Sequence, residues 1–302
     1  MPLTPFPNGL SSFGMPVVSG ARRPYTGTAF FVCNLTNANG SDGNKGTDAG
    51  QPLATLAKAI TLVTANKDDV IYLMEGHAEN ISAAAFIACS TAGFSIVGLG
   101  NGRARPTFTW TATAGTWTVS AANVSIHNCV FVGTGIDAVT TMFAVTGDDC
   151  TFEGCEFDCA ITSFVALLGI TVTGTDRFRF INNHVHGRAV ANMTNFLQIV
   201  GSSGKQKDYI IQGNSFTGNY SSGLGPINNI TVAMTDVVIR NNVMVNRTAA
   251  ATKCIVLVTG STGMVMSNAF GIGSGAAPIT GDAVHWAANW NAAAVATNST
   301  LV

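Results

Sequence analysis

Charge is what this sequence lacks most. Its 302 residues include 15 Lys and Arg and 16 Asp and Glu, so 10% are charged, against roughly 25% in a typical soluble domain. The formal net charge of −1 provides no basic excess for holding a phosphate backbone, and we expect no nucleic-acid partner. A surface with so few charges suits contact with sister chains or a larger assembly.

Long apolar runs and paired cysteine motifs are also missing. No uninterrupted apolar stretch approaches the ~20 residues of a membrane helix. The first 25 residues lack the charged start and apolar core of a signal peptide, so we expect no membrane association and a chain kept in the cytoplasm until assembly. The 7 cysteines show no metal-type pairing apart from the spacing of Cys155 and Cys159. Free buried thiols, with no metal and no cofactor, are expected.

What the sequence has instead is a repeat. Six copies of one nine-residue pattern return every 26 to 31 residues, at 123–131, 149–157, 177–185, 208–216, 236–244 and 262–270. The second, fourth and ninth positions are apolar, as in Val124, Ile126 and Phe131, which is typical of a strand, a corner and a second strand. Apolar runs between the copies, such as 140–145 and 254–258, supply a third strand. The pattern predicts an all-β, single-stranded parallel β-helix.

The seventh position of the repeat forms a column. Asn there tolerates a left-handed turn and, stacked on the Asn of the next rung, can hydrogen-bond the neighbouring side-chain amide. Two thiols fit the same column as small buried apolar groups. We interpret the column as a structural ladder of Cys129, Cys155, Asn183, Asn214, Asn242 and Asn268.

The repeat also sets the domain boundaries. Segments 69–74 and 94–98 carry the same alternation and extend the stack to about eight rungs. Apolar residues at helical spacing behind Pro52 predict a short amphipathic helix at about 52–64 that covers the first rung. We expect an extended arm at 1–27, the β-helix at 28–272 and a C-terminal cap or tail at 273–302. In that tail, Trp286 and Trp290 would cover the last rung or wrap a neighbouring subunit.

Several segments carry a resemblance to known proteins. They are Thr-Ala-Phe-Phe-Val at 28–32, Gly-Ser-Asp-Gly-Asn at 40–44 and Pro-Leu-Ala-Thr-Leu-Ala-Lys-Ala at 52–59, followed by the rungs. With these segments, residues 28–272 resemble the right-handed, pectin-lyase-like parallel β-helix superfamily. The opening 5–16 resembles the leaders of β-helical structural proteins of tailed bacteriophages. The resemblance implies a right-handed solenoid, a homotrimer and a place in the virion after assembly in the host bacterial cytoplasm.

The first 27 residues hold five of the 9 prolines, which fix an extended chain. Such an arm, with Phe6, Phe13, Arg22 and Arg23 as anchors, suits docking into a groove of another protein. A disordered leader is the alternative.

Outward positions of two neighbouring copies suggest one catalytic candidate. Glu156 stacks next to His184 and Asp158 next to His186, in strands about 4.8 Å apart. Four such groups could support acid–base cleavage of a glycan or hold a metal ion. The competing interpretation, which we prefer, is a surface charge ladder between neighbouring strands.

The motifs of β-helical polysaccharide lyases and hydrolases do not carry over. Those enzymes present clustered aspartates with a basic group or a His-Gly and Arg-x-Lys. Here Asp148-Asp149 is the only Asp pair at the six copies of the repeat, and His186-Gly187 has none of its partners.

We therefore expect a non-enzymatic virion protein of a tailed bacteriophage. Capsid decoration, as a cement or head-protrusion trimer on the major capsid protein, is the first hypothesis. The alternative is a tailspike or tail-fibre protein that works beside other tail proteins and binds or cleaves a host surface glycan. A free-standing bacterial polysaccharide lyase would require export, for which the sequence shows no signal.

Overall fold

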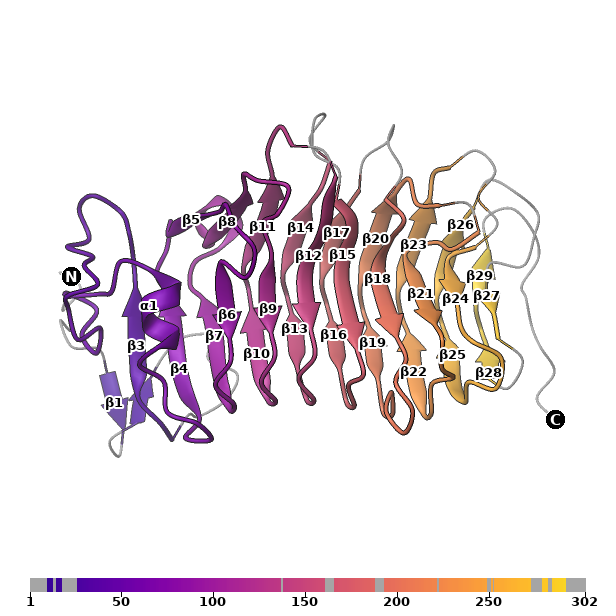
Figure 1. Cartoon of the computed structure of the whole chain (residues 1–302), viewed down its shortest axis with the longest axis horizontal. Helices are drawn as coiled ribbons and strands as arrows, with labels where there is room; N and C mark the ends of the chain where they lie inside the picture. Colours follow the sequence, from indigo (N-terminus) through magenta and orange to yellow (C-terminus); the bar gives the residue numbers. More distant parts are fainter. Residues whose placement is uncertain are drawn as a thin grey trace, which may run out of the picture.

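Three parallel sheets run side by side along the molecule in the computed structural model, which confirms the predicted β-helix (Figure 1). The structure describes residues 10–12, 15–17, 26–136, 138–160, 166–187, 193–221, 223–248, 251, 253–272, 279–281 and 284–291. The sheets contain 10, 9 and 8 strands, and each complete rung adds one strand to each sheet. Within the described residues, no helix is long and apolar enough to span a membrane.

From β4 onward, the strands of each sheet follow one another at every third strand of the chain, and β3 precedes β4 at the edge of the ten-stranded sheet. The ten-stranded sheet contains β3 (Ala29–Val32), β4 (Asp69–Leu73), β7 (Phe94–Gly98), β10 (Val124–His127), β13 (Thr151–Glu153), β16 (Arg179–Ile181), β19 (Ile210–Gln212), β22 (Val237–Arg240), β25 (Gly263–Met266) and β28 (Val284–Ala287). The nine-stranded sheet contains β5 (Ala78–Ile81), β8 (Thr107–Trp110), β11 (Val130–Gly133), β14 (Glu156–Asp158), β17 (His184–His186), β20 (Ser215–Gly218), β23 (Val243–Asn246), β26 (Ala269–Gly271) and β29 (Trp290–Asn291). The eight-stranded sheet contains β6 (Ile87–Cys89), β9 (Trp117–Val119), β12 (Val139–Val145), β15 (Ala166–Thr173), β18 (Asn195–Val200), β21 (Ile227–Ile230), β24 (Ile255–Val256) and β27 (Ile279–Thr280).

The asparagine ladder lies at the corner between the ten- and nine-stranded sheets. Each Asn accepts on its Oδ1 from the backbone N–H of the ladder residue one rung earlier and donates its Nδ2 to a main-chain carbonyl of that rung. Asn183 Nδ2, for example, donates to Phe152 O at 2.9 Å. Cys155 N–H donates to Asn183 Oδ1 at 2.9 Å, and Cys155 Sγ lies 3.7 Å from Ile126 O, so the thiol takes the place of an amide.

Left-handed backbone occurs one residue before the ladder, not at it. The sixth position of the repeat has positive φ in Asn128 (55°), Asn182 (54°) and Asn241 (56°). The left-handed residue turns the chain through the corner, and the next side chain then points into the core, where an amide must be hydrogen-bonded. The prediction that the ladder Asn itself adopts this conformation is therefore wrong.

Aromatic side chains fill the middle of the β-helix. Phe108, Phe131 and Phe157 occupy one inward row of the nine-stranded sheet, where they are in register on neighbouring strands and fully buried. The ring of Phe131 lies 4.9 Å, centroid to centroid, from both Phe143 and Phe157. Trp110 and Trp117 are also fully buried.

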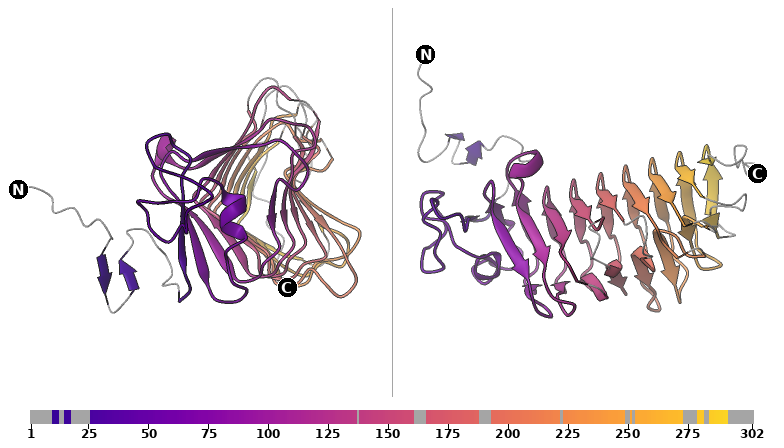
Figure 2. Two further views of the ribbon diagram at one scale, coloured as in Figure 1. Left: turned by 60° about the vertical axis from the view of Figure 1, so that its left-hand side comes forward. Right: turned by 90° about the horizontal axis from the view of Figure 1, so that it is seen from above.

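Helix α1 (Leu56–Ile60) lies across the N-terminal end of the β-helix with Leu56, Ala59 and Ile60 buried (Figure 2). It is shorter than the predicted 52–64. Leu53 is extended because it forms a parallel bridge with Val32, and Thr55 then acts as the N-cap. The position of α1 agrees with a capping role.

Two carboxylates hold the start of α1. Asp42 Oδ1 accepts from the backbone N–H of Ala54 and Thr55, at 3.0 and 2.9 Å. Glu79 Oε1 accepts from Leu56 N at 2.6 Å and lies 2.8 Å from His77 Nε2. The sequence did not indicate this buried His77–Glu79 pair, because its partner in the helix lies 23 residues away from Glu79.

Both ends of the chain differ from expectation. Within the predicted arm, β1 (Leu10–Ser12) and β2 (Met15–Val17) pair as an antiparallel two-stranded sheet, so the arm is not wholly extended. The anchor residues proposed from sequence, Phe6, Phe13, Arg22 and Arg23, lie outside the described residues.

At the other end the β-helix continues past residue 272, because β27, β28 and β29 add one more rung. Asn289 extends the ladder by accepting from Asn268 N at 3.0 Å. The interval of 21 residues between them is shorter than in the six copies, which is why the sequence pattern missed it. Trp290 lies in a strand and is 69% exposed, so it does not cover the last rung. The alternative, contact with a neighbouring subunit, stays a prediction.

Candidate functional site

The structure brings the four candidate residues together as predicted. Glu156 and Asp158 in β14 pair in register with His184 and His186 in β17, on the outward face of the nine-stranded sheet. The intervening Phe157 is buried in the core, which fixes the outward direction of its neighbours.

The two imidazoles lie against each other, with ring centroids 4.1 Å apart and ring planes inclined at 24°. Partial burial lowers the pKa of His184 below its ordinary value, and the neighbouring His186 and Arg105 act in the same direction. The opposing effect of the Glu156 carboxylate is smaller. His184 is therefore neutral at pH 7 and can accept or donate a hydrogen bond.

Arg105 completes this cluster, and sequence reasoning missed it. Its Nη2 donates to Glu156 Oε2, across 51 residues of chain. Arg177, which is closer in sequence, pairs with Asp149 instead, and Arg179 lies in the ten-stranded sheet. Arg188, the third arginine near in sequence, lies outside the described residues.

These contacts limit the chemistry of the cluster. Glu156 Oε2 accepts a charge-assisted hydrogen bond from Arg105, whereas a general acid must donate a proton from that carboxyl group. Asp158 Oδ1 accepts from the Ala160 backbone N–H at 3.1 Å. Among the residues that the structure describes, no group of three or more His, Cys, Asp or Glu could hold a metal ion.

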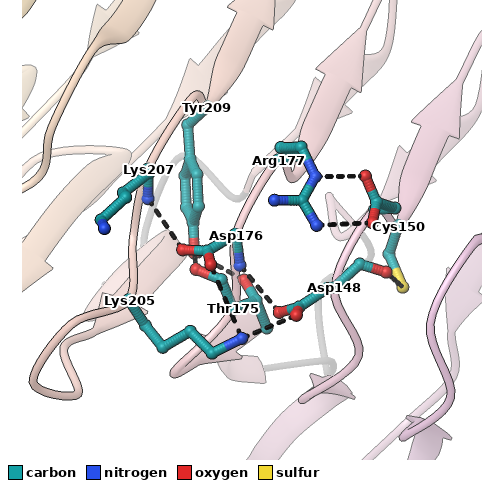
Figure 3. Close-up of polar contacts among 9 residues, drawn as sticks. Asp148, Cys150, Thr175, Asp176, Arg177, Lys205, Lys207 and Tyr209 are labelled. Carbon is teal, nitrogen blue, oxygen red and sulfur yellow. Dashed lines mark hydrogen bonds and ion pairs between the residues drawn. The ribbon is translucent and has the colours of Figure 1, made fainter.

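A second polar cluster lies at the turns that lead into the ten-stranded sheet (Figure 3). Asp148, Asp176 and Lys205 come from three successive rungs. Lys205 Nζ lies 2.6 Å from Asp148 Oδ2 and 3.5 Å from Asp176 Oδ2, and Asp148 Oδ1 accepts from Asp176 N at 2.9 Å. Beside them, Arg177 forms a bidentate pair with Asp149, at 2.6 and 2.8 Å. Two cations pair with three carboxylates across neighbouring rungs, so this cluster is suited to join rungs.

Protonation of Asp148 should weaken this junction. Burial acts to raise the pKa of its carboxyl, but the hydrogen bonds from Lys205 and the Asp176 amide outweigh it, and the pKa lies below its ordinary value. A depressed folded-state pKa adds stability above the unfolded value near 3.9, and that stability is lost as the pH falls through the folded value.

We therefore expect Asp148→Asn to be less stable than the wild type at pH 7, with the difference disappearing as the pH falls through the lowered folded-state pKa of Asp148. Urea unfolding at a series of pH values measures the difference, and Asp236→Asn, at an exposed aspartate outside this cluster, serves as the control. A difference that persists unchanged at low pH would contradict the ion-pair interpretation.

All seven cysteines are free and buried. Burial raises the pKa of the Cys155 thiol, and equally of Cys159, to about 12. The pKa of Cys129 is also raised, again chiefly by burial. Such thiols are inert fillers of the ladder and core and not nucleophiles or metal ligands.

Comparison with known proteins agrees with this architecture. The family model described as "Protein of unknown function (DUF1565)" matches residues 38–286, so the chain belongs to that family. The crystal structure of pectate lyase Pel9A superposes with a TM-score of 0.50 and 13% identity, covering 90% of this chain and 82% of that chain. At this identity the likeness shows the right-handed parallel β-helix fold alone. Comparison with curated proteins finds no match.

Proposed function

We propose that this member of the DUF1565 family is a structural component of a tailed bacteriophage particle, assembled in the host bacterial cytoplasm, which decorates the capsid shell as a homotrimer. It would act by binding energy alone, as a cement or protrusion on the major capsid protein. The arm at 1–27 and the charge-poor exterior of the β-helix would make the contacts.

The observation that carries the proposal is the character of the outward side chains. Val243 (48% exposed), Ala269 and Trp290 (69% exposed) lie in register on three neighbouring strands of the nine-stranded sheet. Met264, 42% exposed, lies in the same part of the ten-stranded sheet. Exposed apolar groups in a row, two of them large, favour burial against another protein over contact with water.

The test is cryo-electron microscopy of the particles whose genome encodes this chain, with and without the gene. The proposal expects protrusions at regular positions on the shell that disappear from the deletion particles. Unchanged shell density, with loss confined to the tail tip, would overturn capsid decoration.

The second hypothesis is a tail protein that binds or cleaves a host polysaccharide. It is favoured by the convergence of Glu156, His184 and His186 on one exposed sheet face and by the likeness in fold to a pectate lyase. Release of sugar fragments from host capsular or acidic polysaccharide by the purified protein measures the activity. Loss of release in Glu156→Gln but not in the control Ser215→Ala, which lies in the same outward row, would support catalysis.

A further inference from the structure

Charge is unevenly divided among the three sheets. We propose that copies of this chain contact one another through the outward face of the eight-stranded sheet, an inference that rests on the multimeric state in the proposed function. No strand of this sheet contains Asp, Glu, Lys, Arg or His. Each copy therefore presents to its neighbour strands without ionisable side chains.

The uncharged face runs along the molecule. Its strands pair in register, and one row includes Ala88, Thr118, Ala144, Thr171, Gln198, Asn228 and Val256. Asn228 is only 2% exposed and interrupts the accessible part of this row, whereas the other six are exposed or half-buried. These side chains are small or neutral, so neighbouring backbones can approach closely. Leu167 of β15 is 39% exposed and Phe86, which directly precedes β6, is 37% exposed, which adds apolar area to the same face.

The other two faces are less suited to self-contact. The ten-stranded sheet presents Glu153, Arg179 and Arg240, and the nine-stranded sheet presents the Glu156 and His184 cluster. In a symmetric contact between identical chains a charged residue near the axis meets its own copy, and a buried like-charge contact is costly. A neutral face avoids that cost. Because a face without charge is compatible with an identical face, a second copy of this chain is the partner that we propose for it.

The size of the face is sufficient for a specific but modest contact. Eight strands about 4.8 Å apart extend over about 34 Å, and strands of about four residues add a width of about 15 Å. Each copy then contributes about 500 Å², and a pair buries about 1,000 Å², near the lower limit for specific interfaces. We therefore expect association that depends on concentration in the micromolar range.

One rung provides a matched set of variants. In the rung formed by β22, β23 and β24, each sheet has one outward, half-buried valine. These are Val238 in β22, Val245 in β23 and Val256 in β24. Val238→Lys, Val245→Lys and Val256→Lys therefore place the same charge on the three faces in turn. The mass of each protein is measured by sedimentation or light scattering between about 1 and 100 μM, with circular dichroism to establish folding.

The proposal expects the wild type to reach a multiple of its 31.2 kDa chain mass. Val256→Lys should raise the dissociation constant at least about tenfold, while the other two variants associate as the wild type does. Gln198→Lys, on the same face, serves if Val256→Lys does not fold. A wild type that remains a monomer at every concentration overturns the proposal, as does dissociation caused by Val238→Lys or Val245→Lys alone.

This measurement uses the isolated protein and is independent of the particle. If the purified protein associates through the eight-stranded sheet but the particles show no shell protrusions, the proposed interface is retained and capsid decoration is overturned. If the shell protrusions are present but the purified protein is a monomer at every concentration, capsid decoration is retained and the proposed interface is overturned.

Discussion

Replacing Asn242 by alanine is expected to lower the free energy of unfolding by about 3–5 kcal/mol, because it removes a buried side chain that joins three rungs. Asn242 Oδ1 accepts from Asn214 N and from Asn214 Nδ2, both at 2.9 Å. Its Nδ2 donates to Ile211 O and to Asn268 Oδ1, again at 2.9 Å. In the variant several of these buried groups lose their partner, and each unpaired group costs about 1–3 kcal/mol.

The adjacent residue provides the control. Asn241 is exposed and has a φ of 56°, and alanine already occupies the corresponding position of the last rung as Ala288, with a φ of 52°. Asn241→Ala should therefore cost about 1 kcal/mol or less. Urea unfolding followed by circular dichroism compares the two variants. Equal losses would show that the ladder contributes no more than the turn beside it.

Phe131→Ala is expected to lower the free energy of unfolding by about 3–5 kcal/mol, because it removes apolar contacts and leaves a cavity. Phe131 is fully buried and its ring contacts those of five other aromatic residues, Phe108, Trp110, Trp117, Phe143 and Phe157. Parallel strands fix the backbone on either side, so the site can collapse only slightly.

Val130 lies on the same strand but points outward and is half-buried. Val130→Ala should therefore lower the free energy of unfolding by less than about 1 kcal/mol. The same denaturation experiment measures both variants. A cost for Phe131→Ala below about 1.5 kcal/mol would mean that the neighbouring rings close the cavity, contrary to a rigid aromatic core.

The ladder and the catalytic candidate illustrate which parts of the site could be predicted. Stacking in register converts a repeat position into a spatial column, so Asn183 and Asn214 could be placed side by side from their spacing alone. The same reasoning placed Glu156 beside His184. Arg105 could not be placed, because it lies in an irregular connection before β8 that has no counterpart in the other copies.

The sequence by itself determined the β-helix, its repeat and the inward or outward direction of most rung residues, because a period shared by many copies needs no long-range information. Only the tertiary structure decided the ion pair of Arg105 with Glu156, the two carboxylates at the start of α1 and the last rung at Asn289. Each depends on how a connection of irregular length folds back on the stack. It also decided that the uncharged strands share one sheet, since that face exists only when the rungs are stacked in register.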